Sequence, residues 1–308
     1  MRRFNLILWV MVTFSSVLMH AQEDKTVSRL EIYDLETKER TVLKEYPFLI
    51  EAPNWTVDGK YLIYNSRGKL YRLDVNNPSS DTEISTVFAD RCNNDHVLSA
   101  DGTRMAISHG TREDGKSRIY TLPLSGGTPT LITPLAPSYL HGWSPDGKML
   151  TYCAERNSNF DVYQILAEGG VEQRLTDAPG LDDGPEYSPC GQYIWFNSVR
   201  SGQMQIWRMK ADGSEQTQMT FDEDRNSWFP HVSPDGGKIV FIRYRKDDVA
   251  PGDHPRGKHV ELCIMPVKGA EPGIIVRLFG GQGTVNVNSW APDSKRFAFV
   301  SYVENSDR

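Results

Sequence analysis

The sequence lacks the short motifs that mark the common enzyme classes. It contains no Gly-x-Ser-x-Gly elbow of a serine hydrolase, no phosphate-binding loop, no dinucleotide fingerprint and no His-Glu-x-x-His zinc motif. Its 34 basic and 40 acidic residues give a net charge of −6, and the basic residues form no stripe along the chain. Recognition of phosphate backbones needs such a concentration of positive charge, so nucleic acid is not an expected partner.

Cysteine is scarce as well, with four residues in 308. No pair has the Cys-x-x-Cys spacing of a zinc or redox site. Cys153 and Cys263 fall in expected strands, Cys92 precedes the second repeat, and Cys190 stands where other repeats carry a turn Asp. We therefore expect buried free thiols and no disulfide framework.

Long hydrophobic runs are confined to the N-terminus. Arg2 and Arg3 precede an apolar stretch over residues 6–18, and Met19-His20-Ala21 offers a cleavage site. This order is typical of a secretory signal peptide and is too short for a membrane span. We expect a signal peptide over residues 1–21 and a single domain over 22–308. The protein would then be periplasmic or secreted, without membrane insertion, and a monomer.

What the sequence has instead is an internal repeat. A tetrapeptide resembling Ser-Pro-Asp-Gly recurs six times, and its third positions are 43, 45, 44, 45 and 58 residues apart. A repeat of about 40–50 residues made of short strands and turns is typical of a β-propeller with one blade per copy. We therefore predict an all-β, six-bladed propeller with four-stranded antiparallel blades. The six copies begin at Thr56, Ser99, Ser144, Ser188, Ser233 and Ala291.

Blade four shows the expected plan of one blade. Hydrophobic and polar residues alternate along it, and turns containing Gly interrupt the alternation, which is the pattern of β-hairpins. The inner strand is expected to end at residue 187, before the tetrapeptide turn. The three strands that follow are expected over residues 192–198, 204–209 and 215–220.

The two ends of the chain do not fit a simple count of four strands per blade. After the sixth turn only one strand is expected, over residues 296–302, whereas two unassigned strands, 28–36 and 39–45, precede the first blade. If these N-terminal strands pair with the C-terminal one, they complete the last blade and close the ring. Closure would also remove exposed sheet edges.

The repeated turn Asp has a structural explanation. Pro sets φ at the first central position, Asp accepts hydrogen bonds from nearby amides, and Gly takes the positive φ that closes the hairpin. A residue needed by every turn recurs in every blade, whereas a catalytic acid would appear once. We therefore predict that these Asp residues are structural.

The last interval is longer because of an insertion over residues 246–258, between the second and third strands of blade five. Its two Pro and two Gly residues predict a loop. Loops of this length in compact domains often carry function. We expect His254, with Asp253, to reach over the channel mouth.

The inner strands carry polar residues that differ from blade to blade. Residues serving six equivalent structural roles should look alike, so this variety predicts a ligand site at one mouth of the channel. The apolar column just before each turn is expected to pack between blades. The candidate ligand-binding residues are His96, His141, Asp182, Asp183, Trp228, His231, Asn286 and Asn288.

Several interpretations of these residues stay open. They could bind a saccharide or a protein segment by hydrogen bonds and stacking, without metal. Alternatively His96, His141 and His231 could hold one divalent metal (Mn, Zn or Ca) in a polysaccharide lyase or hydrolase, with Asp183 or Glu186 as the base. The histidines could also simply satisfy buried groups in the channel. A non-catalytic interaction scaffold that uses a blade face or the insertion is a further alternative.

The repeat resembles the TolB-type six-bladed propeller. The likeness rests on the Ser-Pro-Asp-Gly turn, the aromatic strand after it and the x-Leu-Thr ending, as in residues 144–152, 167–176 and 211–220, and it extends over about residues 28–302. More distantly the chain resembles the propellers of prolyl-oligopeptidase-type enzymes and of oligogalacturonate lyases, which bind metal through channel histidines. Stretches such as 181–185 and 228–231 are similar to those of stand-alone TolB-like periplasmic proteins. The resemblance implies a propeller of the bacterial periplasm.

Overall fold

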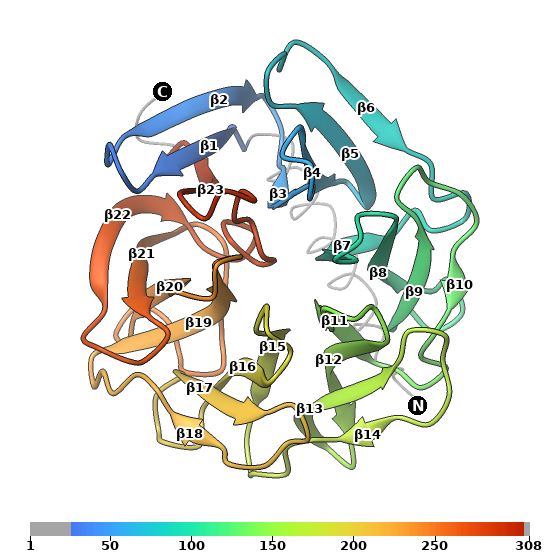
Figure 1. The fold of residues 1–308 in the computed structure, drawn as a ribbon, viewed down its shortest axis with the longest axis vertical. Coiled ribbons are helices and arrows are strands. Elements are labelled where there is room, and N and C mark those ends of the chain that lie inside the picture. Colours follow the sequence, from blue (N-terminus) through green and yellow to red (C-terminus); the bar gives the residue numbers. More distant parts are fainter. Residues whose placement is uncertain (1–25, 305–308) are drawn as a thin grey trace, which may run out of the picture.

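The computed structural model describes residues 26–304, and these form a ring of six antiparallel sheets around a central channel (Figure 1). The predicted all-β, six-bladed propeller is confirmed. The expected signal peptide lies outside the described residues. Within residues 26–304, no helix has the length and apolar character needed to cross a membrane.

Five blades have four strands each, and the order of pairing places the first strand on the channel and the fourth on the rim. The strands in ring order are β3 to β6 (Glu51–Trp55, Tyr61–Ser66, Lys69–Asp74, Asp81–Ile84), β7 to β10 (Cys92–Leu98, Arg104–Gly110, Ser117–Pro123, Thr130–Leu131), β11 to β14 (Ser138–Trp143, Met149–Arg156, Asn159–Leu166, Gln173–Arg174), β15 to β18 (Asp182–Tyr187, Tyr193–Ser198, Gln205–Lys210, Thr217–Gln218) and β19 to β22 (Arg225–Val232, Lys238–Arg245, Lys258–Pro266, Gly273–Gly280).

The sixth blade joins the two ends of the described chain. Strand β1 (Ser28–Asp34) lies between β2 (Arg40–Tyr46) and β23 (Arg296–Tyr302), antiparallel to both. The inner position is taken by residues 284–291, which reach β23 through the Trp290–Phe297 bridge and a bond from the Val300 amide to the Thr284 carbonyl at 3.0 Å. The N-terminal strands therefore complete the last blade, as expected.

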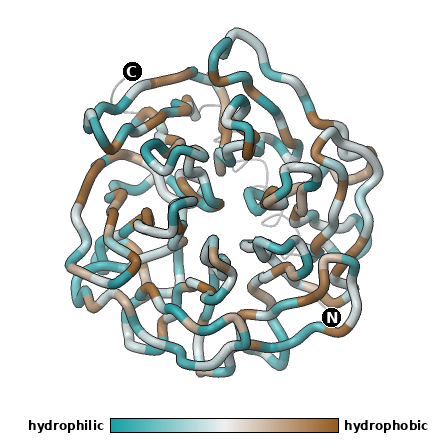
Figure 2. The backbone as a smooth tube through the Cα atoms, in the orientation of Figure 1, coloured by the Kyte–Doolittle hydropathy of each residue, from teal (hydrophilic) through white to brown (hydrophobic). Residues whose placement is uncertain are grey.

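The second strand of each blade is largely buried. In β16 five of six residues are buried, and Trp195 and Phe196 are at most 2% exposed. Because each blade is covered on both faces by its neighbours, the sequence of this strand is a run of hydrophobic residues and does not alternate between hydrophobic and polar residues. Hydrophilic stretches recur instead at the hairpin tips that surround the channel (Figure 2).

The tetrapeptide turns have the predicted construction. In blade three the Ser144 hydroxyl donates to Asp146 at 2.6 Å, and Asp146 also accepts from the Lys148 amide at 3.1 Å. Gly147 has φ +74°, the left-handed region in which glycine carries no steric penalty. The recurring Asp is therefore part of the turn.

A β-bulge interrupts each of the five regular inner strands, β3, β7, β11, β15 and β19. In β15 the bulge contains Gly184 at φ +62°, where an added Cβ would lie 2.5 Å from the Asn197 side-chain oxygen. In β19 it contains Phe229, at φ +56°. A bulge adds one residue and changes which side chains face the channel.

The insertion between β20 and β21 folds back onto the ring. The Asn226 side chain donates to the Val249 carbonyl at 3.0 Å, and the Tyr244 hydroxyl donates to the Pro255 carbonyl at 3.3 Å. These bonds hold the segment against β19 and β20. Residues 246–257 thus form an ordered loop at the channel, and Lys258 begins the next strand.

All four cysteines are free thiols, as expected, but only three are buried. Cys190 is exposed in the blade-four turn, where its sulfur lies 3.3 Å from the Ser188 hydroxyl. Sulfur is a weak acceptor compared with the carboxylate that serves the same turn in other blades.

We therefore expect Cys190→Asp to stabilise the protein. The carboxylate would accept a charge-assisted hydrogen bond from the Ser188 hydroxyl, worth about 1 kcal/mol in the free energy of unfolding. Urea denaturation measures the change. Cys190→Ala is the matched control and should not stabilise; an Asp variant no more stable than the Ala variant would contradict the turn argument.

Candidate functional site

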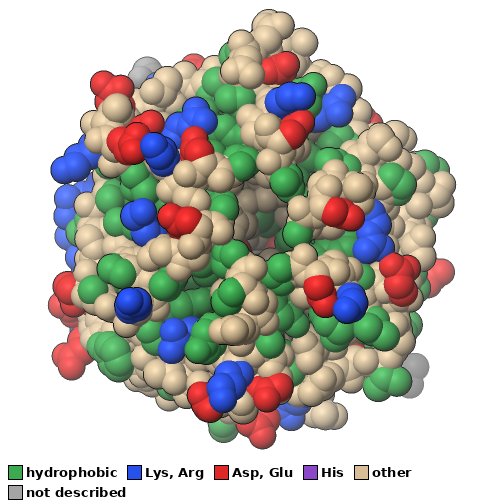
Figure 3. Space-filling view, in the orientation of Figure 1, with side chains coloured by type: hydrophobic (Ala, Val, Ile, Leu, Met, Phe, Trp, Pro, Cys, Tyr) green, Lys and Arg blue, Asp and Glu red, His purple; other side chains and the backbone are tan. Residues whose placement is uncertain are grey.

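The central channel has a cavity at each end. Residues from the first half of the inner strands line one cavity of about 470 Å³, here called the acidic cavity. Residues from the second half line the other, of about 430 Å³, here called the turn-side cavity. The space-filling view shows the channel as a central hollow on one face, with hydrophobic side chains near its rim (Figure 3). The acidic cavity is lined by Asn93, Asp95, Tyr139, His141, Cys153, Phe160, Leu181, Asp183, Phe229, Gly252, His254, Gln282 and Asn286.

His141 and Asp183 form an ion pair on the wall of the acidic cavity. Nε2 of His141 lies 3.1 Å from Oδ1 of Asp183, and both side chains are nearly buried. Burial alone would lower the pKa of His141, but the Asp183 carboxylate raises it above its usual value. The same pairing outweighs burial at Asp183 and lowers the pKa of that carboxyl. The pair is therefore held in its charged form.

Asp95 is the second carboxyl of this cavity and has a different environment. It accepts hydrogen bonds from the side chains of Asn93, at 2.5 Å, and Asn286, at 2.7 Å. Burial, together with the charge of Asp183, raises the pKa of Asp95. Asn286 is 1% exposed, and within residues 26–304 its Oδ1 has no hydrogen-bond partner. The Oδ1 of Asn286 is thus an acceptor that the described residues leave unpaired.

His254, from the insertion, lies over this cavity. Its ring lies 4.3 Å from that of Trp228 and meets Phe229 edge-on at 5.2 Å, centroid to centroid. Burial lowers the pKa of His254, so the ring is neutral. Its Nδ1 is buried, and no partner for it lies within the described part of the chain. The interpretation that the insertion reaches a channel mouth agrees with this position.

The structure distributes the eight predicted ligand residues over several places. His141, Asp183 and Asn286 line the acidic cavity. Asn288 lines the turn-side cavity together with Glu186, to whose carboxylate its amide donates at 2.7 Å. His96, Asp182, Trp228 and His231 line neither cavity.

The side-chain contacts do not support the alternative in which three imidazoles hold one metal. His96 points between blades one and two, with Nε2 3.4 Å from the Ile63 carbonyl. Both ring nitrogens of His231 have hydrogen-bond partners. Nδ1 lies 2.6 Å from the Glu186 carboxylate, and Nε2 lies 3.0 Å from the Val285 carbonyl. Among residues 26–304 no group of three or more His, Cys, Asp or Glu side chains is arranged to hold a metal. These three residues therefore do not fit a shared metal site.

The physical reason lies in the strand register. His141 is the unpaired residue of its bulge, which turns it toward the channel, whereas His96 sits after its bulge in regular pairing with Ile107. His231 is one position nearer its turn than the other two. A shift of one residue reverses the direction of a side chain in a strand.

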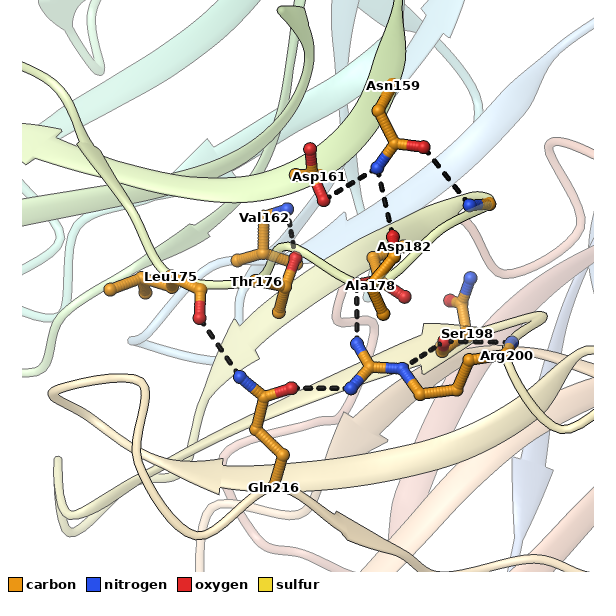
Figure 4. Close-up of polar contacts among 12 residues, drawn as sticks. Asn159, Asp161, Val162, Leu175, Thr176, Ala178, Asp182, Ser198, Arg200 and Gln216 are labelled. Carbon is orange, nitrogen blue, oxygen red and sulfur yellow. Dashed lines mark hydrogen bonds and ion pairs between the residues drawn. The ribbon is translucent and has the colours of Figure 1, made fainter.

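The carboxylate of Asp182 is also engaged in a structural contact, a buried ion pair. It is 1% exposed and pairs at 2.5 Å with Arg200, whose guanidinium also binds Ser198 at 2.8 Å and Gln216 at 2.5 Å (Figure 4). Asp182 therefore anchors the network that joins β15 to the rest of its blade. Trp228 is fully buried in the core of blade five, and its neighbour Phe229 faces the cavity instead.

Sequence reasoning missed Asp95, Tyr139, Phe160 and Phe229 as cavity residues. Phe229 stacks on the His141 ring at a centroid distance of 5.8 Å and an interplanar angle of 21°. Asp95 adjoins the chosen His96, and Phe229 adjoins the chosen Trp228. The place of the bulge differs between β7 and β11, and it decides which of two neighbouring residues faces the cavity.

His96 makes stability depend on pH in a defined direction. Burial lowers its pKa to about 4, so the folded state holds it neutral while the unfolded chain, at about 6.5, takes up a proton. We expect this residue to remove roughly 3 kcal/mol of unfolding free energy as the pH falls from 6.5 to 4. Denaturation of wild type and His96→Gln across that range measures the difference in slope. Exposed His259→Gln should keep the wild-type slope; an unchanged slope in His96→Gln would contradict the assignment.

Comparison with known proteins agrees with the fold. Residues 134–254 match the family described as the TolB beta propeller domain. An uncharacterised protein of Agrobacterium fabrum is 50% identical over 275 residues, which covers 89% of this chain and 92% of that protein.

Solved structures give the same relationship. A candidate TolB from Agrobacterium tumefaciens has a TM-score of 0.86 at 49% identity, over 91% of this chain and 99% of that chain. An oligogalacturonate lyase solved in complex with manganese has a TM-score of 0.58 at 16% identity, over 90% of this chain and 83% of that chain, a likeness that shows the fold alone. The repeat, the closed ring and these relatives together show that this chain belongs to the TolB-like β-propeller family.

Proposed function

We propose that the protein binds a saccharide in the acidic cavity at the channel mouth. The observation that carries this proposal is that two carboxyl groups, Asp95 and Asp183, and several aromatic rings line the same cavity of about 470 Å³. Ligand sites are typically concave and mostly apolar, with a few polar groups that fix orientation. This cavity has that composition.

The polar atoms of the cavity are mainly acceptors, and each Asp95 oxygen already accepts one hydrogen bond. The carboxyl oxygens of Asp95 and Asp183 and the unpartnered Oδ1 of Asn286 all accept hydrogen bonds. A ligand that satisfies them must be rich in donors. A sugar supplies such donors, because its adjacent hydroxyl groups can each donate a hydrogen bond to a different acceptor of the cavity.

The apolar part of the wall suits the other surface of a sugar. Tyr139, Phe160 and Phe229 line the cavity together with Leu181. A pyranose ring exposes its C–H bonds on one face, and these pack on an aromatic ring while the hydroxyls at the edge reach polar groups. The His141 ring behind Phe229 supports that face, since the two are stacked.

The space beside the cavity favours an extended ligand. A further cavity of about 640 Å³, distinct from the turn-side cavity, shares Asn93 and Gln282 with the acidic cavity and continues between blades one and two. A single sugar would fill only part of this combined space. We therefore infer an oligosaccharide in preference to a monosaccharide.

A hydrolase or lyase acting on such a ligand is the second candidate. It is favoured by one observation, the opposite pKa shifts of the two carboxyls, which favour the protonated form of Asp95 and the ionised form of Asp183, the states needed by an acid and by a base. Asp183 keeps the role of base in this alternative. Glu186 faces the other cavity and hydrogen-bonds Asn288, so it does not share that role.

Binding can be tested with a panel of neutral and acidic oligosaccharides, using thermal denaturation and calorimetry. A saturating ligand should raise the unfolding free energy by about 2.7 kcal/mol at one hundred times its Kd. Asp183→Asn should weaken binding at least tenfold, because a hydrogen bond to a charged acceptor is worth roughly 1.5–3 kcal/mol.

The matched control is Asp177→Asn, the same chemical change at an exposed residue outside both cavities. It should bind like wild type. Equal affinities for the two variants, or no bound member of the panel, would refute the saccharide proposal. Binding of a basic peptide that Asp183→Asn abolishes would instead assign the cavity to a protein segment.

A further inference from the structure

A separate cavity of about 580 Å³ lies between blades five and six, away from the channel. It shares no lining residue with either channel cavity. Its wall is dominated by one residue type, and we call it the arginine cleft. The arginines that line it are Arg29, Arg40, Arg225, Arg243, Arg245 and Arg277.

The arginines of blade five lie side by side because of the strand register. Arg225 of β19 is directly opposite Arg245 of β20, and in the next row Arg243 of β20, Glu261 of β21 and Arg277 of β22 pair across the sheet. Residues opposite one another, or two apart along a strand, project from the same face. Four guanidinium groups therefore share one end of one sheet face.

Acids offset much of this charge. The two arginines of blade six pair with Glu45 and Glu31, and Asp248 and Glu304 also line the cleft. The four arginines of blade five outnumber the acids beside them, which are Glu261, Asp222 and Asp248.

Glu261 is the common partner of three arginines, at 3.3 Å from Arg225, 3.3 Å from Arg277 and 3.9 Å from Arg243. Arg243 also pairs with Asp222 at 2.7 Å. Arg245 is exposed and has no ion pair within residues 26–304.

One charged group is buried without full satisfaction. Arg243 is 7% exposed, and its Nε has no hydrogen-bond partner in the described part of the chain. Burying an unpartnered donor of a charged group is costly, and so is placing like charges opposite one another in a sheet. An anion in the cleft would offset both costs.

We propose that the arginine cleft binds an oxyanion of the phosphate or sulfate class. Guanidinium groups match such anions because their planar forks donate two parallel hydrogen bonds, and several can surround one tetrahedral group. Ion pairs with Glu261 hold the guanidinium groups of Arg225 and Arg277 in place. Arg245 and the exposed edge of Arg277, which is 71% exposed, supply the donors that face solvent.

The proposal is tested on the full chain by titrating inorganic phosphate and sulfate in the low millimolar range at constant ionic strength, with chloride as the reference salt. Calorimetry and thermal denaturation should both show saturable binding. Sulfate at high concentration stabilises folded proteins generally, so saturation at low concentration is the informative signal. The Arg245→Gln/Arg277→Gln double variant should bind at least tenfold more weakly than wild type.

Arg112→Gln is the matched control, since Arg112 is 70% exposed and lies in blade two, outside the cleft. It should bind phosphate like wild type. Saturable binding that survives in the double variant, or no saturable binding at all, would overturn the proposal. Asp183→Asn should leave phosphate binding unchanged, so the saccharide proposal and this one can fail independently.

Discussion

The antiparallel pairing of β1 with β23 is the constraint on which the rest of the molecule depends. A blade can bury its two faces only against two neighbours, so an open ring would expose hydrophobic surface on its first and last blades. The closing sheet is held by more than its backbone. Glu31, 1% exposed on β1, accepts hydrogen bonds from Arg40 of β2 and from Ser301 of β23. This buried, paired carboxylate ties three strands together, and its loss would leave the partly exposed Arg40 without its partner.

Ring closure determines where the inner strands lie, and their bulges determine what those strands present. Every regular inner strand carries one bulge, so the side chains before and after it serve different ends of the channel. Asp183 faces the acidic cavity, whereas Glu186, three residues later, faces the turn-side cavity. The two mouths of the channel are thus chemically distinct, and His141 lines the cavity at each of them.

The two proposed sites use opposite chemistry on the same scaffold. The channel mouth exposes acceptors beside aromatic rings, which suits a hydroxyl-rich ligand. The cleft between blades five and six exposes guanidinium donors, which suits an oxyanion. Most of their lining residues lie on strands. In the acidic cavity Leu181, Gln282 and Asn286 lie between strands, and Gly252 and His254 come from the insertion. Rigid strands hold side chains in place more firmly than loops do, which is an advantage for recognition.

The sequence by itself determined the blade number, the turns, the place of the insertion and the closure by the N-terminal strands, because each depends on a period or on a turn chemistry that is local in the chain. It also directed attention to the inner strands, from which His141, Asp183 and Asn286 do reach one cavity. Only the tertiary structure decided which neighbours of these residues face the channel, since a one-residue bulge reverses side-chain direction without changing composition. It alone also brought together arginines from residues 29 to 277, which are scattered in the sequence and meet because blade six lies beside blade five in the closed ring.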